Sequence, residues 1–122
     1  MSEISQTPRP PDVPRNLKPY FLCLLRKGSH WDQPHGHEDL MSRHLSFIRR
    51  LTEAGTIVFA GPALGHTLNP FDDVTGITIL RAENLNAANS VASQDPAVQA
   101  GHLIAELRPV FLPPLDAVRV EY

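Results

Sequence analysis

The stretch HLSFIRRLTEAGTIVFAGP, residues 44–62, decides the fold because it places an amphipathic helix directly before a strand. One face of this helix collects its apolar positions together with one histidine: Leu40, His44, Phe47, Ile48 and Leu51. The pattern predicts a helix over residues 38–54, stopped by Gly55. A strand over residues 56–60 should follow, ended by Gly61 and Pro62.

The segments on either side supply the other elements. The continuous apolar run YFLCLL is typical of a strand covered on both faces. Asp95 should interrupt the second helix, because a residue that precedes proline is disfavoured in the helical conformation. The remaining expected elements are a strand at 20–25, a strand at 76–81, a helix at 85–93, a further helical turn at 97–100 and a strand at 103–107.

The order strand, helix, strand, strand, helix, strand predicts an α+β fold of the ferredoxin-like type, with an antiparallel sheet and two helices on one face. The strands are apolar on both faces, since Ile77 and Ile79 point one way and Leu80 the other. The second face must therefore be covered, and we expect the same face of another subunit to do so in a homodimer. The alternative is that the tail at 110–122 folds back across the sheet.

The chain divides into three parts by composition. Residues 1–18 carry four prolines among polar side chains and predict an extended or disordered arm. Residues 19–112 hold the predicted elements and form a single domain, which is all that 122 residues allow. Residues 113–122 are expected to form a C-terminal tail.

Charge and composition exclude several classes of function. The formal net charge of −2 argues against a nucleic-acid-binding surface. No apolar run approaches the ~20 residues that cross a bilayer, and the polar start of the chain is unlike a signal peptide, so a cytoplasmic protein is expected. No glycine-rich phosphate loop is present, and we expect no nucleotide cofactor. The single cysteine, Cys23, lies in an apolar run and indicates a buried structural thiol rather than a catalytic one.

Three segments in this order resemble the YCII-related family. They are YFLCLLRKGSHW at residues 20–31, HLSFIRRLTEAGTIVFAGPAL at 44–64 and GITILRAENLNAANSVASQDPAVQAG at 76–101. The resemblance implies a ferredoxin-like fold that commonly pairs into a dimeric α/β barrel. Its members include a dehydrochlorinase that acts on a chlorinated hydroxyhydroquinone. In the family, a histidine on the first helix and an aspartate in a DP element are the candidate catalytic residues, and here they are His44 and Asp95.

His44 and Asp95 also have a physical rationale as a pair. His44 lies in the apolar stripe, so it should face the sheet, where an oriented imidazole can act as base or acid near neutral pH. Asp95 can turn inward at the helix break and fix the imidazole tautomer. The structural alternatives are a hydrogen-bonded core histidine and an aspartate that only caps the following turn.

The loop after the first strand holds further candidates. Arg26 and Trp31 are predicted substrate contacts, which would pair with and stack on a planar anionic compound. The alternatives place Trp31 at a subunit interface and Arg26 in solvent. His30, His35 and His37 are dense enough to suggest a metal-dependent enzyme, but their spacing matches no metal motif, and a solvated loop without metal is expected.

The sequence thus predicts a small-molecule enzyme without a redox cofactor. His44 would transfer a proton and Asp95 would orient it in an elimination, isomerisation or hydration of a cyclic or aromatic compound, which is lyase or isomerase chemistry. The competing hypothesis is a non-catalytic ligand-binding or accessory module that uses the same cavity. The sequence does not determine the substrate of the protein, because one fold is shared by many activities.

Overall fold

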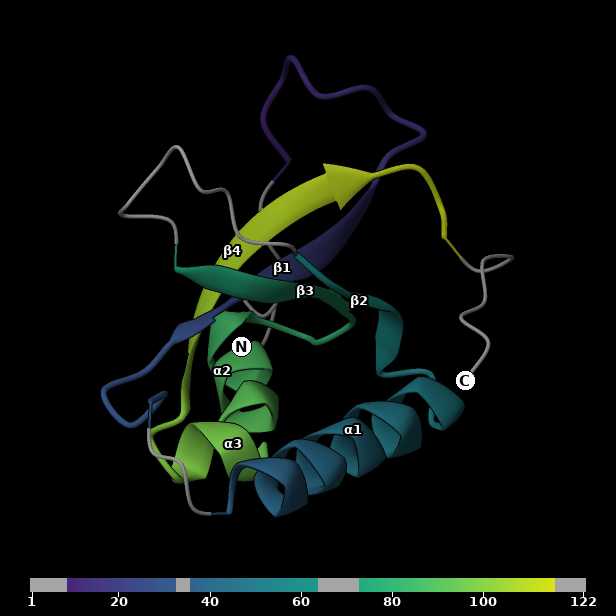
Figure 1. Cartoon of the computed structure of the whole chain (residues 1–122). Helices are drawn as coiled ribbons and strands as arrows, with labels where there is room; N and C mark the ends of the chain where they lie inside the picture. The colour runs from purple at the N-terminus through teal and green to yellow at the C-terminus, as the bar shows by residue number, and fades with distance from the viewer. Residues whose placement is uncertain (1–8, 33–35, 64–72, 116–122) are drawn as a thin grey trace.

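The computed structural model describes residues 9–32, 36–63 and 73–115, in which a four-stranded antiparallel sheet carries three helices on one side (Figure 1). The strands lie in the order β2-β3-β1-β4. The elements in chain order are β1 (Lys18–Lys27), α1 (His37–Glu53), β2 (Ile57–Pro62), β3 (Val74–Leu80), α2 (Leu85–Ala92), α3 (Pro96–Gln99) and β4 (Leu103–Leu112). This is the predicted α+β ferredoxin-like arrangement, and the prediction is confirmed.

The central strand β1 fixes the two faces of the sheet. It pairs with both β3 and β4, and Cys23 lies opposite Thr78 on one side and Leu107 on the other. Because side chains alternate along a strand, Phe21, Cys23 and Leu25 all point toward the helices and join the main core. Cys23 is a free, buried cysteine, as its position in the apolar run predicted.

Helix α1 covers the sheet with the predicted stripe. Its buried residues are His44, Phe47 and Ile48. Gly55 follows the helix with φ of 81°, a conformation that glycine adopts without the steric cost of a Cβ atom. Although α1 has 17 residues, its outer face is polar, and no helix in the described part of the chain is long and apolar enough to cross a membrane.

All four strands extend beyond the residues that the sequence indicated, and β2 and β4 do so through prolines. Strand β2 includes Gly61 and Pro62, which were expected to end it, and β4 continues through Pro109 to Leu112. Both are the outermost strands of the sheet. An outermost strand tolerates proline because a missing N–H need not face a neighbouring strand, and prolines here are therefore compatible with the sheet.

The sheet face opposite the helices carries a second, smaller apolar cluster. Tyr20, Val58 and Ile79 are its buried residues. Leu115 packs on this cluster, and its backbone N–H donates to the Tyr20 hydroxyl at 3.0 Å. Leu115, just after β4, thus covers part of this face, which is the arrangement predicted by the alternative in which the tail folds back across the sheet. Ile104 on the same face remains 52% exposed.

The described part of the N-terminal arm lies next to the end of β4. The Arg9 guanidinium donates to the carbonyl oxygens of Pro14 and Leu17, and it lies over the ring of Phe111 at 5.1 Å from the centroid. These contacts join residues 9–17 to the sheet.

Candidate active site

The structure brings His44 and Asp95 together. His44 Nδ1 lies 2.6 Å from Asp95 Oδ2, although the two residues are 51 positions apart in the chain. Only 9% of the His44 side chain and 3% of the Asp95 side chain are exposed. A contact of this length between buried groups is a charge-assisted hydrogen bond when Asp95 is ionised, with Nδ1–H as donor.

The break between α2 and α3 holds Asp95 in this position. Asp95 is the N-cap of α3, and its Oδ1 accepts the backbone N–H of Ala97 at 2.9 Å. Pro96 follows it at the first helical position, where a proline costs no hydrogen bond. One carboxylate thus caps α3 with one oxygen and contacts His44 with the other, so the capping role of Asp95 does not exclude its contact with His44.

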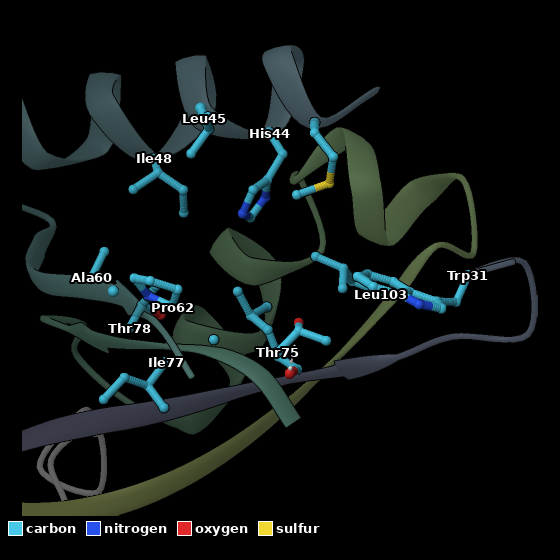
Figure 2. A pocket seen from close by; sticks show the side chains of 14 residues that line it. Trp31, His44, Leu45, Ile48, Ala60, Pro62, Thr75, Ile77, Thr78 and Leu103 are labelled. Carbon is cyan, nitrogen blue, oxygen red and sulfur yellow. Dashed lines mark hydrogen bonds between the residues drawn. The ribbon is translucent and has the colours of Figure 1, made fainter. Parts of the chain in front are cut away.

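Beside His44 lies a cavity of about 390 Å³ between α1 and the sheet (Figure 2). Met41, His44, Leu45 and Ile48 contribute its α1 side. Ala60 to Pro62 of β2 and Thr75 to Thr78 of β3 form the opposite wall, and Leu25, Trp31 and Leu103 complete it. Figure 2 shows His44 projecting from α1 into this space. Because Asp95 engages Nδ1, Nε2 is the ring atom that remains for a ligand.

The cavity wall is largely apolar and, among the described residues that line it, carries no Asp, Glu, Lys or Arg side chain. Its polar side chains are His44, Thr75, Thr78 and the indole of Trp31. The Thr75 hydroxyl donates to the Leu25 carbonyl at 3.2 Å. Among the described residues of the wall, His44 carries the side chain suited to act as a general base or acid.

Cys23 lies behind this wall and is unreactive in character. Burial raises the pKa of the Cys23 thiol to about 11, the hydrogen bond with Thr78 opposes this shift, and the negative charge of Asp95 adds to it. A thiol with so high a pKa is protonated at neutral pH and is a poor nucleophile.

Trp31 lines the cavity and is held there by an aromatic support that the sequence did not reveal. Its ring stacks on His102 with centroids 4.4 Å apart and an angle of 27° between the planes. His37 meets both rings edge-on, at 5.9 Å from Trp31 and 4.8 Å from His102. Lys27 Nζ lies 5.6 Å from the Trp31 ring centroid. The indole is therefore held in place where it lines the cavity.

His102 is buried, with 2% exposure, and its Nε2 is a buried atom without a hydrogen-bond partner in the described structure. Burial lowers the pKa of the His102 imidazole below its usual value, and the nearby His37 and His44 act in the same direction. Hydrogen bonding to the backbone of His30 opposes them. The neutral form of His102 is thus the favoured partner of Trp31.

A close approach of two glycines docks the Trp31 loop. A Cβ atom on Gly28 would collide with the Gly101 carbonyl group. The approach lets Gly28 N–H donate to the His102 carbonyl at 2.8 Å and His30 N–H to the Gly101 carbonyl at 2.9 Å. The two glycines were the available sequence signal for this support, but they lie 73 positions apart and nothing local joins them.

Arg26 lies elsewhere. Its guanidinium donates to Glu106 at 2.7 Å and to Asp73 at 2.6 Å. These two carboxylates raise the pKa of Arg26, with Glu106 contributing most, and Arg26 with Arg108 lowers the pKa of Glu106. Alternation along β1 directs Arg26 away from the helices, opposite to Leu25, and it is not among the described residues that line the cavity. A ligand of this cavity would have Trp31, and not Arg26, beside it.

The histidines considered as an alternative metal site make contacts with different parts of the structure. His30 Nδ1 lies 3.0 Å from the Ala100 carbonyl oxygen, and His37 packs in the aromatic cluster with Trp31. His35 falls outside the described residues. Within the ranges that the structure describes, no three His, Cys, Asp or Glu side chains gather so as to hold a metal ion.

Fold and site together define a ferredoxin-like α+β domain with a buried histidine–aspartate pair beside an apolar cavity. Residues 20–111 match the YCII-related domain, and the chain belongs to this family. No curated protein matches the chain.

Among solved structures, the chain is similar to 5-chloro-2-hydroxyhydroquinone dehydrochlorinase from Burkholderia phenoliruptrix, in complex with 2,5-dihydroxybenzoquinone. The two are 27% identical, with a TM-score of 0.51. The match covers 73% of this chain and 90% of the other.

Proposed function

We propose that this chain is a small-molecule enzyme in which His44 transfers a proton to or from a cyclic or aromatic substrate, without a redox cofactor. The observation that carries the proposal is the 2.6 Å contact between His44 and Asp95 at the wall of a 390 Å³ cavity. A buried histidine whose second nitrogen is held by a carboxylate, and which borders a ligand-sized space, meets the geometric requirements of a general base.

In the proposed step, Nε2 of His44 takes a proton from the substrate and Nδ1–H stays bound to Asp95. The carboxylate stabilises the imidazolium that forms, because the positive charge arises 2.6 Å from it in a buried site. Elimination is completed when the electron pair of the broken bond expels a leaving group. Isomerisation is completed when His44 returns the proton to another atom of the same substrate.

The similarity to a dehydrochlorinase supports this chemistry. Dehydrochlorination removes a proton together with chloride, so the activity named for that protein requires a group that accepts a proton. At 27% identity, the two share a fold over 73% of this chain and 90% of the other. The ligand named in that structure is a ring compound, which is the class that we propose for this cavity.

The test is turnover by matched variants. Phenols and cyclic compounds, beginning with 5-chloro-2-hydroxyhydroquinone, are screened for conversion, with chloride release followed where chlorine is present. We expect His44→Gln and Asp95→Asn to lower kcat by about 10²–10⁴-fold. The control is His30→Gln, which changes an exposed histidine outside the described cavity wall and should keep the rate. Full activity in His44→Gln would overturn the proposal.

A non-catalytic ligand-binding or accessory module is the second candidate, because the same cavity could hold a ligand without converting it. It predicts that the His44 and Asp95 variants change folding or affinity but that no screened compound is turned over. Melting temperatures measured beside kcat separate the two: the enzyme hypothesis requires a loss of rate in a variant that melts like the parent.

We also propose that the chain works as a homodimer through the sheet face opposite the helices. Ile77 and Ile104 are exposed on strands whose neighbouring side chains form the smaller apolar cluster around Ile79. Burying apolar surface of this kind against its own copy is favourable. Light scattering at micromolar concentration should give a molar mass twice that of one chain. Ile104→Arg should reduce the measured mass to that of one chain. A wild type that stays monomeric would contradict the dimer.

A further inference from the structure

We propose that the substrate of this cavity is an uncharged amphiphile larger than a single ring. Its reacting polar group lies at His44, and its apolar part extends out of the cavity along Leu45. The inference rests on the proposed function in placing the substrate in this cavity, and it names the class of compound. It replaces the anionic substrate that the sequence suggested through Arg26.

The size of the cavity sets the first limit. A volume of about 390 Å³ lies in the range of pockets that enclose most of a drug-sized ligand, which is about 300–1,000 Å³. One six-membered ring at His44 would leave much of this space to water, against a wall that offers water few partners. A ligand with a second apolar ring or chain fills it and buries more apolar surface.

The chemistry of the wall sets the second limit. His44 and Thr78 both line the cavity, and apart from Thr75 and the Trp31 indole the other described side chains of the wall are apolar. Among the described lining residues, no Lys or Arg is present to pair with an anion. Arg26 is held by Glu106 and Asp73 outside the described wall. Burial of an unpaired charge is strongly unfavourable, so a charged ligand is selected against.

The rim of the cavity sets the third limit. Leu45 follows His44 on α1, lines the cavity and is nevertheless 52% exposed. Pro62 lines the cavity from β2 and is also exposed. Large apolar side chains that border an opening offer contact to the part of a ligand that extends outward. The ligand therefore has its polar group inside, near His44, and apolar surface along the rim.

A pair of dyes that differ by one sulfonate group tests this inference directly. N-phenyl-1-naphthylamine is uncharged, and 8-anilino-1-naphthalenesulfonate (ANS) carries the same ring skeleton with a negative charge. Fluorescence titration of each dye against the full chain gives two values of Kd. We expect the uncharged dye to bind at least about 100-fold more tightly, because the cavity wall leaves the sulfonate unpaired. Emission of Trp31, the only tryptophan, should fall as the dye fills the cavity that it lines.

Charge placed at the rim provides the matched variants. Leu45→Arg should lower the ratio of the ANS Kd to the Kd of the uncharged dye by about tenfold, because a cation at the opening attracts the sulfonate. Leu85→Arg makes the same change at an exposed helical leucine outside the described wall and should leave the ratio unchanged. Ile104→Arg does so on the opposite sheet face, and it too should leave the ratio unchanged.

Equal affinities for the two dyes would overturn the inference. So would a ratio that responds to Ile104→Arg but not to Leu45→Arg, because the dye would then bind the opposite sheet face. Dye binding requires no chemistry, so the outcome is independent of turnover. Tight binding of the uncharged dye without turnover of any compound would contradict the proposed function and leave the ligand class standing. Turnover of anionic compounds by a protein without the dye preference would remove the substrate class alone.

Discussion

Replacement of Asp95 separates the two bonds that its carboxylate makes. In Asp95→Asn, the side-chain oxygen still accepts the Ala97 N–H and the amide donates to His44 Nδ1, so both positions keep a partner. Asparagine caps helices as well as aspartate does, and the free energy of unfolding should fall by no more than about 1 kcal/mol. Because Nδ1 must now accept, the ring proton moves to Nε2, and His44 can no longer take a proton from a substrate.

Asp95→Ala removes both bonds, and the cost can be added up. Loss of the cap is worth about 1 kcal/mol. A buried Nδ1 of His44 without a partner adds about 1–3 kcal/mol, for a total of about 2–4 kcal/mol. For a domain of this size, each kcal/mol lowers Tm by about 3–5 °C, so the alanine variant should melt about 6–20 °C below the parent. Asn84→Ala removes a cap alone, at α2, and should cost only about 1 kcal/mol.

Urea unfolding followed by circular dichroism measures the stabilities, and long-range ¹⁵N NMR of the imidazole reports the tautomer of His44. The expected order of stability is parent, Asp95→Asn, Asn84→Ala and then Asp95→Ala. The reasoning would be refuted if Asp95→Ala were no less stable than Asp95→Asn. It would also be refuted if the tautomer of His44 were the same in the parent and in Asp95→Asn.

Three further predictions concern the surroundings of the site. Because the pKa of His102 is lowered on folding, the unfolded chain binds more protons than the folded one in acid. The free energy of unfolding should therefore fall as pH drops through about 6.5 and below. His102→Phe keeps a ring against Trp31 and should flatten this part of the pH profile measured by urea unfolding. Gly28→Ala should cost about 1–3 kcal/mol and shift Trp31 emission to longer wavelength, whereas Gly61→Ala, with open space around its Cβ, should be neutral in the same measurements. With a pKa of about 11, Cys23 is about one thousandth thiolate at pH 8, so a disulfide reagent should label it only after unfolding; rapid labelling of the native protein would contradict its burial.

The fold could be predicted from local patterns. The stripe that contains Phe47 and Ile48 and the glycine after it defined α1 to within a residue or two. The ends of β2 and β4 were less predictable, because proline usually ends a strand and Pro62 and Pro109 are tolerated only at the sheet edges. Whether a strand lies at an edge depends on the order of all four strands, which a local pattern does not contain.

The site was only partly predictable for a related reason. His44 and Asp95 could be nominated because each sits at a position with a local signal, a histidine in an apolar stripe and an aspartate before a proline. Arg26 looked available because the sequence does not show that its guanidinium is paired with Asp73 and Glu106. His102 was missed because its support of Trp31 arises from contact between segments about 70 residues apart.

The most direct test of the central claim is proton abstraction itself, measured as deuterium incorporation from deuterium oxide into 2-tetralone, an uncharged bicyclic ketone with an acidic C–H bond. The wild type should accelerate exchange above the buffer rate, and Asp95→Asn, which keeps its fold, should lose about 10²–10⁴-fold of that acceleration. Equal exchange rates for the wild type and Asp95→Asn would contradict the account, because His44 held by Asp95 would then not be the group that moves the proton.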